Sequence, residues 1–382
     1  MSPISLLLRR AYSSSSAAAA ALNAAYEVIF KESDLKLVVE TFKKHTQNPR
    51  FRNKSSFYEH TVQRLAKTRS FNLIEEILED QKQYNDITEE GFTVRLISLY
   101  GKSGMFDHAH KLFDEMPQLN CKRTVMSFNA LLKACVSSKK FDKIDGFFRE
   151  LPGKLSIKPD VVSYNTLIKG LCEMGCLDSA LLMLDEMENE GLKPDLFSFN
   201  ILLDAFYKKK RFLDGEKIWG SMGKYNVVPD FISYNAKLLG FVLEEKIQDA
   251  VELIQEMKSQ DVKLDVTTYN ILFKGLCSDE KFIGEAKTWY DEMMKTKCPP
   301  NRQTFATLLR FACNNEDFHF ASRLCRGLLY RHCRLNEGGM LQKVVDGLVK
   351  QSNIKDAEIL VRLGKDSRHS CYHNVKMPMF EK

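Results

Sequence analysis

The sequence lacks the features that mark most membrane proteins and enzymes. No apolar run approaches the roughly 20 residues that a membrane helix needs, so we expect no membrane insertion. There is no glycine-rich phosphate loop, no histidine pair with metal-ligand spacing on a helix and no Gly-x-Ser-x-Gly turn. We therefore expect a binding protein with no catalytic residues, no metal site and no cofactor.

Neither charge nor cysteine content defines a function. The chain has 56 Lys and Arg against 50 Asp and Glu, and its net charge of +6 permits a polyanionic partner without requiring one. Ten cysteines could form disulfides, but they are scattered along the chain, which favours reduced, packed cysteines.

Acidic residues are absent before Glu27. This segment contains Arg9, Arg10, a serine run and an alanine tract, a composition typical of organellar transit peptides. The stretch from Arg10 to Ser13, RAYS, also resembles the processing pattern of plant mitochondria. We expect residues 1–26 to be a transit peptide to the mitochondrial matrix. The alternatives are a chloroplast address and a disordered basic N-terminus.

What the chain does contain is a unit of about 35 residues that recurs along its length. Its fourth residue is aromatic, asparagine follows in five copies, and a Lys-Pro-Asp turn or a variant of it closes the unit. Self-similarity at this period predicts a solenoid. The fourth-place aromatic residues are Phe128, Tyr164, Phe199, Tyr234, Tyr269 and Phe305.

Each copy predicts two helices. In residues 161–195, apolar residues lie on one face of each helix, Gly175 separates the helices, and Gly191 ends the second. The apolar residues are Tyr164, Leu167, Ile168 and Leu171, then Ala180, Met183, Leu184 and Met187. We predict an all-α fold, a right-handed α-solenoid of stacked helix-turn-helix pairs with about nine to ten repeats of ~35 residues.

The array predicts one elongated domain, because stacked repeats have no internal boundary. A degenerate N-terminal helical cap is expected over 27–54, and a loose tail is expected over 369–382. The predicted array covers 55–336, and a partial C-terminal repeat covers 337–368. The copies begin at Ser55, Glu90, Val125, Val161, Leu196, Phe231, Val266 and Arg302.

The unit resembles the pentatricopeptide repeat, in the class with uniform repeats found in plant organelles. The resemblance covers about 55–336 and is carried by YNTLIKGLC, DEM and GLKPD. The tetratricopeptide repeat has a period of 34, but its Trp-x-x-Leu-Gly pattern is absent here.

The resemblance implies binding of single-stranded RNA, in which the fifth and last residues of a repeat contact one base. Amide and carboxylate groups suit base edges, and apolar second residues can stack on bases. In this family Asn with Asp favours uracil and Asn with Asn favours cytosine, which implies a target U-U-U-U followed by C or U. The pairs are Asn129 with Asp160, Asn165 with Asp195, Asn200 with Asp230, Asn235 with Asp265, and Asn270 with Asn301; the second residues are Met126, Val162, Phe197, Ile232 and Thr267.

Two alternatives remain for these polar residues. The aspartates also fit ordinary helix N-caps, and the asparagines fit local hydrogen bonding. Lys139, Lys169 and Lys209 are candidates for phosphate contacts, but basic residues also suit helix C-termini. The acidic residues of second helices, such as Glu186, are expected on the outer face.

The layout resembles small pentatricopeptide proteins of plant mitochondrial ribosomes, especially across 113–134 and 150–169. This resemblance implies a structural RNA-binding component of that ribosome, in the small subunit. Its concave face would contact ribosomal RNA, its partners would be mitochondrial ribosomal proteins, and no DNA partner is expected. The alternative is a trans-acting single-stranded RNA-binding factor for stability or translation of a mitochondrial mRNA. A third possibility is protein binding through the concave face.

Overall fold

The computed structural model describes residues 26–335 and 339–378. The predicted transit peptide therefore lies, except for Tyr26, outside the described residues. The described part is helical and contains no β-strand. The chain divides into two compact units, residues 1–194 and 195–382.

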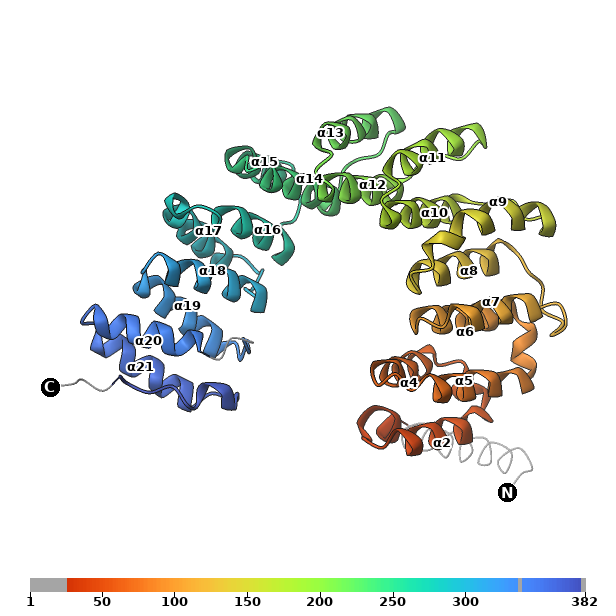
Figure 1. Ribbon diagram of the computed structural model, residues 1–382, viewed down its shortest axis with the longest axis horizontal. Coiled ribbons are helices and arrows are strands. Elements are labelled where there is room, and N and C mark those ends of the chain that lie inside the picture. The colour runs from red at the N-terminus through yellow and green to blue at the C-terminus, as the bar shows by residue number, and fades with distance from the viewer. Residues whose placement is uncertain (1–25, 336–338, 379–382) are drawn as a thin grey trace, which may run out of the picture. The chain divides into compact units, whose positions relative to one another are not determined.

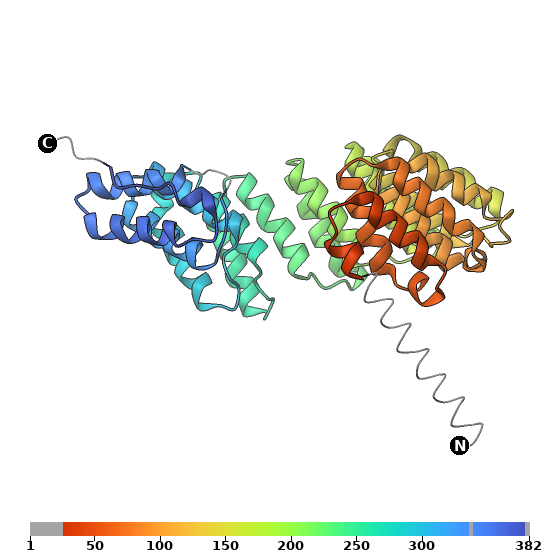
Figure 2. The same ribbon diagram turned by 90° about the horizontal axis from the view of Figure 1, so that it is seen from below.

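In the first unit, helix pairs stack side by side (Figure 1 and Figure 2). Residues 26–31 are helical and precede the pairs. Short 3-10 turns η1 (Asp80–Gln83), η2 (Asn85–Thr88) and η3 (Phe141–Lys143) connect some of the helices. The helices are α2 (Leu35–Thr46), α3 (Pro49–Arg52), α4 (Ser55–Lys67), α5 (Phe71–Glu79), α6 (Glu90–Lys102), α7 (Phe106–Glu115), α8 (Val125–Ser137), α9 (Ile144–Leu155), α10 (Val161–Met174) and α11 (Leu177–Asn189).

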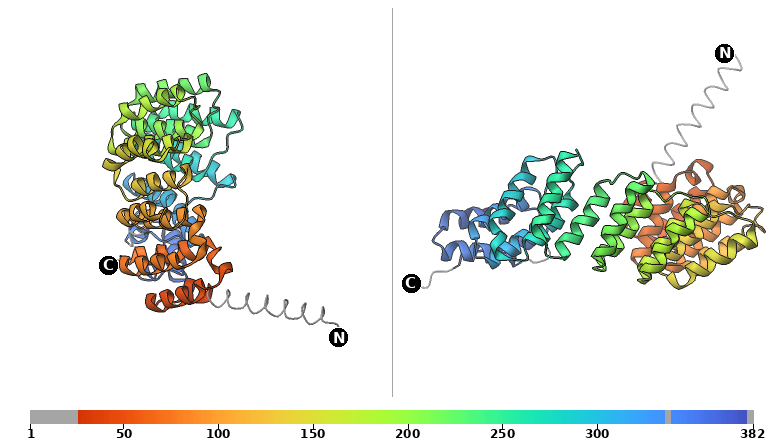
Figure 3. Two further views of the ribbon diagram at one scale, coloured as in Figure 1. Left: turned by 90° about the vertical axis from the view of Figure 1, so that its right-hand side faces the viewer. Right: turned by 90° about the horizontal axis from the view of Figure 1, so that it is seen from above.

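The second unit repeats this arrangement (Figure 1 and Figure 3). Its 3-10 turns are η4 (Met222–Tyr225), η5 (Glu280–Phe282) and η6 (Ser370–Tyr372). Its helices are α12 (Leu196–Lys208), α13 (Phe212–Ser221), α14 (Phe231–Leu243), α15 (Ile247–Ser259), α16 (Val266–Leu276), α17 (Ile283–Lys295), α18 (Arg302–Asn314), α19 (Phe318–Tyr330), α20 (Met340–Lys350) and α21 (Ile354–Lys365).

The helix pattern follows from the sequence period. The even-numbered helices from α4 to α18 are the first helices of their pairs, and each begins at the residue where a repeat begins. In the pair α10 and α11, the predicted apolar residues from Tyr164 to Met187 are buried, and Gly175 ends α10 in the left-handed conformation, with φ of 82°. The prediction of an all-α solenoid of helix pairs is confirmed.

Within each unit, first helices pack on the first helices of neighbouring pairs. The fourth-place aromatic residues fill this layer and are at most 3% exposed. Tyr164 also donates a hydrogen bond to Glu186 of the second helix (3.2 Å). Tyr234 and Glu256 form the same contact at 3.0 Å.

Glu186 departs from the expectation that the acidic residues of second helices all face solvent. Asp185, Glu188 and Glu190 are exposed, but Glu186 is half-buried. It accepts from Tyr164 and from Arg149 of the preceding pair (Nη2 to Oε2, 2.9 Å). These partners hold the pKa of Glu186 below its usual value, the hydrogen bond from Arg149 being the largest cause.

The C-terminal residues are packed where the structure describes them, and not loose as expected for 369–382. Tyr372 is 1% exposed, and its hydroxyl accepts from the Leu335 backbone N–H at 2.7 Å. Gln342 exchanges two hydrogen bonds with the Lys376 backbone, at 2.8 and 2.9 Å. This segment packs against α21, where Tyr372 and Val375 are buried.

All ten cysteines are free thiols, and four of them lie on α-helices: Cys135, Cys172, Cys313 and Cys325. Among the described helices, none combines the length and the apolar content needed to cross a bilayer. No cluster of three His, Cys, Asp or Glu side chains that could hold a metal ion is present in residues 26–335 or 339–378.

Candidate nucleic-acid interface

The fifth-place asparagines lie at the N-terminal ends of the first helices and are largely buried. Their exposed fractions range from 3% for Asn165 to 8% for Asn200 and Asn235. A buried amide must be hydrogen-bonded. The partners of these amides therefore decide what the asparagines can offer to a ligand.

Asn129 shows the arrangement. Its Nδ2 donates to Oδ1 of Asp160 at 3.0 Å, and its Oδ1 accepts from the Ser163 hydroxyl at 2.6 Å. Oδ1 of Asp160 also accepts from the Ser163 backbone N–H at 2.9 Å, which caps helix α10. We call this set, Asn, Asp and Ser or Thr, the capping network. It joins the first helix of one repeat to the first helix of the next.

The second unit contains the same capping network three times. The Asn-to-cap distances are 3.1 Å for Asn200 to Asp230, 3.3 Å for Asn235 to Asp265, and 3.3 Å for Asn270 to Asn301. The hydroxyl groups that donate to the asparagine Oδ1 atoms at 2.6 to 2.7 Å belong to Ser233, Thr268 and Thr304. Four of the five predicted pairs each lie within one unit, and the structure brings each of these four together. Asn165 and Asp195 belong to different units, and Asp195 caps α12 through Ser198 N–H at 2.9 Å.

The capping role proposed as the alternative is therefore present in every case. Capping engages only one side-chain atom of the cap residue, however. In Asp160, Asp230 and Asp265 all the hydrogen bonds of the capping network converge on Oδ1. The other carboxylate oxygen, Oδ2, lies outside the network, and in Asn301 the atom outside it is the amide nitrogen. An Asp cap thus presents an acceptor and an Asn cap presents a donor.

The capping network holds the cap carboxylates in their charged form. For Asp160, burial alone would raise the pKa, but hydrogen bonds from Asn129 and Ser163 outweigh it and lower the pKa below its usual value. The pKa of Asp265 is lowered in the same way, with Thr268 and Asn235 as donors against the effect of burial. Both residues are therefore anionic at neutral pH.

The second residues of these helices are exposed although most of them are apolar. Their exposed fractions are 44% for Met126, 41% for Val162, 58% for Phe197 and 48% for Ile232, and Thr267 is exposed as well. Each lies one residue before the buried Ser or Thr of the capping network. A regular row of exposed apolar side chains beside polar atoms is what base stacking requires.

The three candidate lysines are all exposed, but they occupy different places. Lys169 lies on α10 four residues after Asn165, and so on the same face of the helix. Lys139 follows α8 and Lys209 caps the C-terminus of α12. They therefore lie at the far ends of their helices, about 20 Å from the first turn at 1.5 Å per residue.

Sequence reasoning missed one row of residues with the same period. The Ser or Thr of the capping network occupies the third place of successive repeats, at Ser127, Ser163, Ser198, Ser233, Thr268 and Thr304. Basic residues occupy the ninth place of four repeats, at Lys133, Lys169, Lys274 and Arg310, whereas Asp204 and Leu239 stand there in two others. The 35-residue step is the signal that could have found the Ser and Thr row.

Sequence reasoning also missed Glu90, for which the repeat pattern gives no signal. Glu90, the first residue of α6, accepts hydrogen bonds from the Thr124 backbone N–H at 2.8 Å and the Ser127 backbone N–H at 3.1 Å. It thus caps α8 from the preceding repeat, where Val94 stands in place of asparagine. Burial opposes ionisation of Glu90, but these hydrogen bonds outweigh it and lower its pKa.

The capping networks repeat along a chain that also matches family models. The model described as PPR repeat family matches residues 95–137, 159–208 and 229–278, and the model described as PPR repeat matches 126–154, 197–227 and 267–298. Together they cover more than half of the chain. The chain belongs to the PPR repeat family.

Two curated PPR relatives come from Arabidopsis thaliana. The chain is 58% identical over 161 residues to "Small ribosomal subunit protein mS79 (rPPR3b)", covering 42% of this chain and 41% of the relative. It is 56% identical over 161 residues to "Small ribosomal subunit protein mS78 (rPPR3a)", covering 42% and 40%. The match thus spans about two fifths of each relative's length.

A solved PPR structure has the same fold. The crystal structure of the pentatricopeptide repeat protein PPR10 from maize superposes with a TM-score of 0.52 at 17% identity, covering 86% of this chain and 56% of that chain. The similarity shows that the two proteins share the fold, a solenoid of helix pairs.

Proposed function

We propose that this PPR protein is a structural RNA-binding component of the small subunit of a plant mitochondrial ribosome. The observation that carries the proposal is the 58% and 56% identity to two proteins named as small ribosomal subunit proteins. The N-terminal composition, with Arg9 and Arg10 and no acidic residue before Glu27, supports import into mitochondria.

The proposed RNA contact is the N-terminal end of the first helices. There the cap residues present one polar atom outside each capping network, and the exposed second residues flank it. The ninth-place basic residues lie on the same face, two turns along the helix. Bases would stack on the second residues, their edges would meet the cap residues, and phosphates would meet the basic residues.

Asp160, Asp230 and Asp265 present the same acceptor, so the surface offers the same contact at several repeats. Such a surface favours runs of uridine, or single-stranded loops rich in one base, over a unique target sequence. This monotony suits a permanent contact with ribosomal RNA, because a permanent component need not select one RNA among many.

Sedimentation of mitochondrial lysate tests this function. An epitope-tagged chain should migrate with the small subunit at high magnesium, near one copy per subunit, and should stay there after nuclease has trimmed messenger RNA. A factor that binds messenger RNA would leave the ribosomal fractions at that nuclease step. Recovery of the chain only in light, RNase-sensitive fractions would contradict the ribosomal role.

A further inference from the structure

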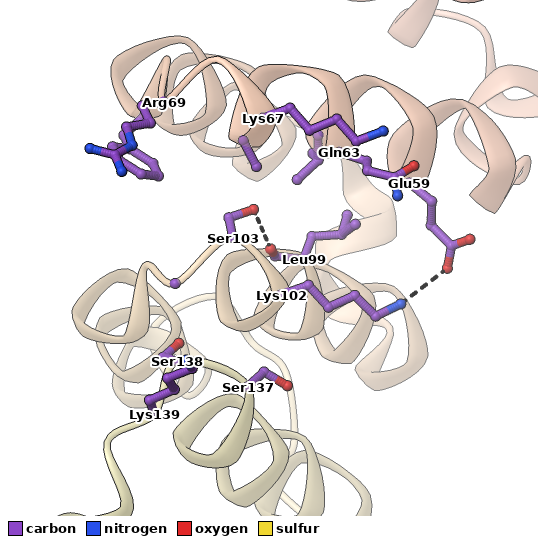
Figure 4. Close-up of a pocket in the computed structure, with 14 residues that line it drawn as sticks. Glu59, Gln63, Lys67, Arg69, Leu99, Lys102, Ser103, Ser137, Ser138 and Lys139 are labelled. Carbon is purple, nitrogen blue, oxygen red and sulfur yellow. Dashed lines mark hydrogen bonds and ion pairs between the residues drawn. The ribbon is translucent and has the colours of Figure 1, made fainter. Parts of the chain in front are cut away.

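A hollow of about 750 Å³ lies between the C-terminal ends of the first helices α4, α6 and α8 in the first unit. Its wall is partly apolar, formed by Val62, Leu99 and Phe71, of which Phe71 is 42% exposed. Its other lining residues are mostly polar or basic. Figure 4 shows Lys67 and Arg69 on the α4 side, Lys102 on α6 and Lys139 after α8.

The hollow carries an excess of positive charge. Four cations line it against one carboxylate, Glu59, which pairs with Lys102 at 3.5 Å. Within the described residues, the side chains of Lys67, Arg69 and Lys139 form no ion pair. Three cationic side chains therefore face one hollow without an acidic partner, an arrangement that favours an anionic ligand.

Two of these cations come from turns held in an unusual conformation. Arg69 and Lys139 lie 70 residues apart at the same place of their repeats, and both are left-handed, with φ of 56° and 57°. Gly104 stands between them at the same place with φ of 78°. Glycine adopts this conformation at the least cost, because a side chain there meets the backbone. The turn geometry alone therefore does not call for Arg or Lys.

Nor does the end of a helix require a basic residue here. Basic side chains are favourable near helix C-termini, but α10 in the same unit ends with Glu173, Met174 and Gly175. At the corresponding turn of the second unit stand Lys210, Glu245 and Glu316, also left-handed, with φ of 59°, 61° and 53°. A basic residue at this turn is therefore not a property of every repeat.

Two of the three helices that form the hollow, α4 and α6, do not carry complete base-contact pairs at their other ends. The fifth residues of the repeats at 55 and 90 are Glu59 and Val94. The carboxylate of Glu90 already accepts hydrogen bonds from Thr124 and Ser127 at the start of α8. Residues 55–124 thus lack the asparagine networks of the later repeats, but they carry most of the basic hollow.

We propose that this hollow binds the sugar–phosphate backbone of structured RNA without regard to sequence. Lys67, Arg69 and Lys139 contact phosphates, and the apolar wall at Phe71 receives a sugar or an unstacked base. The inference rests on the proposed function, that the chain binds RNA. It assigns a second contact, at the opposite end of the first helices from the capping networks.

The test is a pair of triple variants of the full chain. The hollow variant lacks the unpaired cations of the hollow and carries the substitutions Lys67→Gln, Arg69→Gln and Lys139→Gln. The control variant replaces three exposed lysines elsewhere in the same unit, with the substitutions Lys36→Gln, Lys44→Gln and Lys111→Gln. Equal thermal midpoints for the two variants and the unmodified chain establish that all three are folded.

The probes are an RNA hairpin with a 16-base-pair stem and a uridine-free tetraloop, and single-stranded oligo-U. The hollow variant should bind the hairpin about tenfold or more weakly at 0.1 M salt, and its log–log salt slope should be smaller by about 2 to 3. The control variant should lose less than about twofold, and the hollow variant should bind oligo-U as the unmodified chain does.

Equal loss of hairpin binding in both variants would overturn the proposal. So would competition by polyglutamate as effective as competition by RNA of the same charge, because the hollow would then accept any polyanion. A different result would separate the two proposals. If the unmodified chain does not bind oligo-U, and only the hollow variant loses hairpin binding, the base-contact model is wrong but the proposal for the hollow is supported. Loss of oligo-U binding alone in the hollow variant would contradict a separate site.

Discussion

Asn129 and Asp160 lie in successive repeats, and one hydrogen bond of 3.0 Å joins the amide of the first to the carboxylate of the second. The same carboxylate oxygen caps α10. The residues predicted to contact bases are therefore also the residues that connect neighbouring repeats. Any experiment on base contact must separate these two roles, because replacing the asparagine disturbs both.

The structural role predicts a loss of stability from Asn235→Ala. The substitution leaves the Thr268 hydroxyl and the Asp265 carboxylate without their buried partner, which costs about 1 to 3 kcal/mol. Denaturant unfolding followed by circular dichroism measures this change. Asn314→Ala is the matched control, since Asn314 is exposed at the end of α18 and its loss should cost less than about 0.5 kcal/mol. Equal stability of the two variants would show that the capping network does not stabilise the unit.

The chain itself provides a substitution that separates structure from base contact. Asn301 caps α18 with the same network that Asp230 forms at α14. Asp230→Asn should therefore keep the fold, but it replaces the acceptor outside the network with a donor. Binding to an oligonucleotide with cytosine in place of the third uracil should improve by roughly tenfold relative to oligo-U, about one hydrogen bond. An unchanged preference, at an unchanged thermal midpoint, would mean that this cap does not contact a base.

Exposed apolar residues give a prediction that leaves the core intact. Phe197→Ala should weaken oligo-U binding by about 1 to 3 kcal/mol, because it removes a stacking surface. Leu213→Ala, on the second helix of the same repeat, is the control, since Leu213 is 81% exposed on α13. Fluorescence anisotropy with labelled oligo-U measures both. The stacking model is wrong if the two substitutions weaken binding equally.

Acid should weaken the capping networks that contain aspartate. The folded-state pKa values of Asp160 and Asp265 are lowered, so each group stabilises the fold above its unfolded pKa, near 3.8. That contribution is lost as pH falls from there through the folded-state pKa. Thermal midpoints should therefore drop below about pH 4.

Asp265→Asn should flatten that part of the pH profile, since an amide does not titrate. Its thermal midpoint at pH 7 should stay close to that of the unmodified chain, as the Asn301 network suggests. A profile of the same steepness in the variant would assign the acid sensitivity to other carboxylates.

The helix frame could be predicted because it is local and periodic. The aromatic residue at the place of Tyr164 and the methionine at the place of Met187 recur at fixed steps, and Gly175 and Gly191 mark the ends of their helices, so neighbouring residues alone specify each pair. The positions of the proposed base-contact pairs followed from the same period. The period could not show that Asn129, Asn200, Asn235 and Asn270 are buried and bonded to the next repeat's cap.

The repeat pattern did not predict the contacts between residues that are distant in the sequence. Glu90 reaches 34 residues forward to Thr124, and Tyr372 contacts Leu335 from a segment with no repeat period. Both depend on how neighbouring pairs pack, and a single unit does not encode that. The dual role of Glu186, half-buried between Tyr164 and Arg149, was missed for the same reason.

Crosslinking of the full chain to 4-thiouridine oligonucleotide, followed by mass spectrometry of the peptides, tests the central claim most directly. The account predicts crosslinks to the first turns of the first helices, at Met126, Val162, Phe197 and Ile232. Crosslinks confined to the second helices, around Leu182 and Leu213, would contradict it.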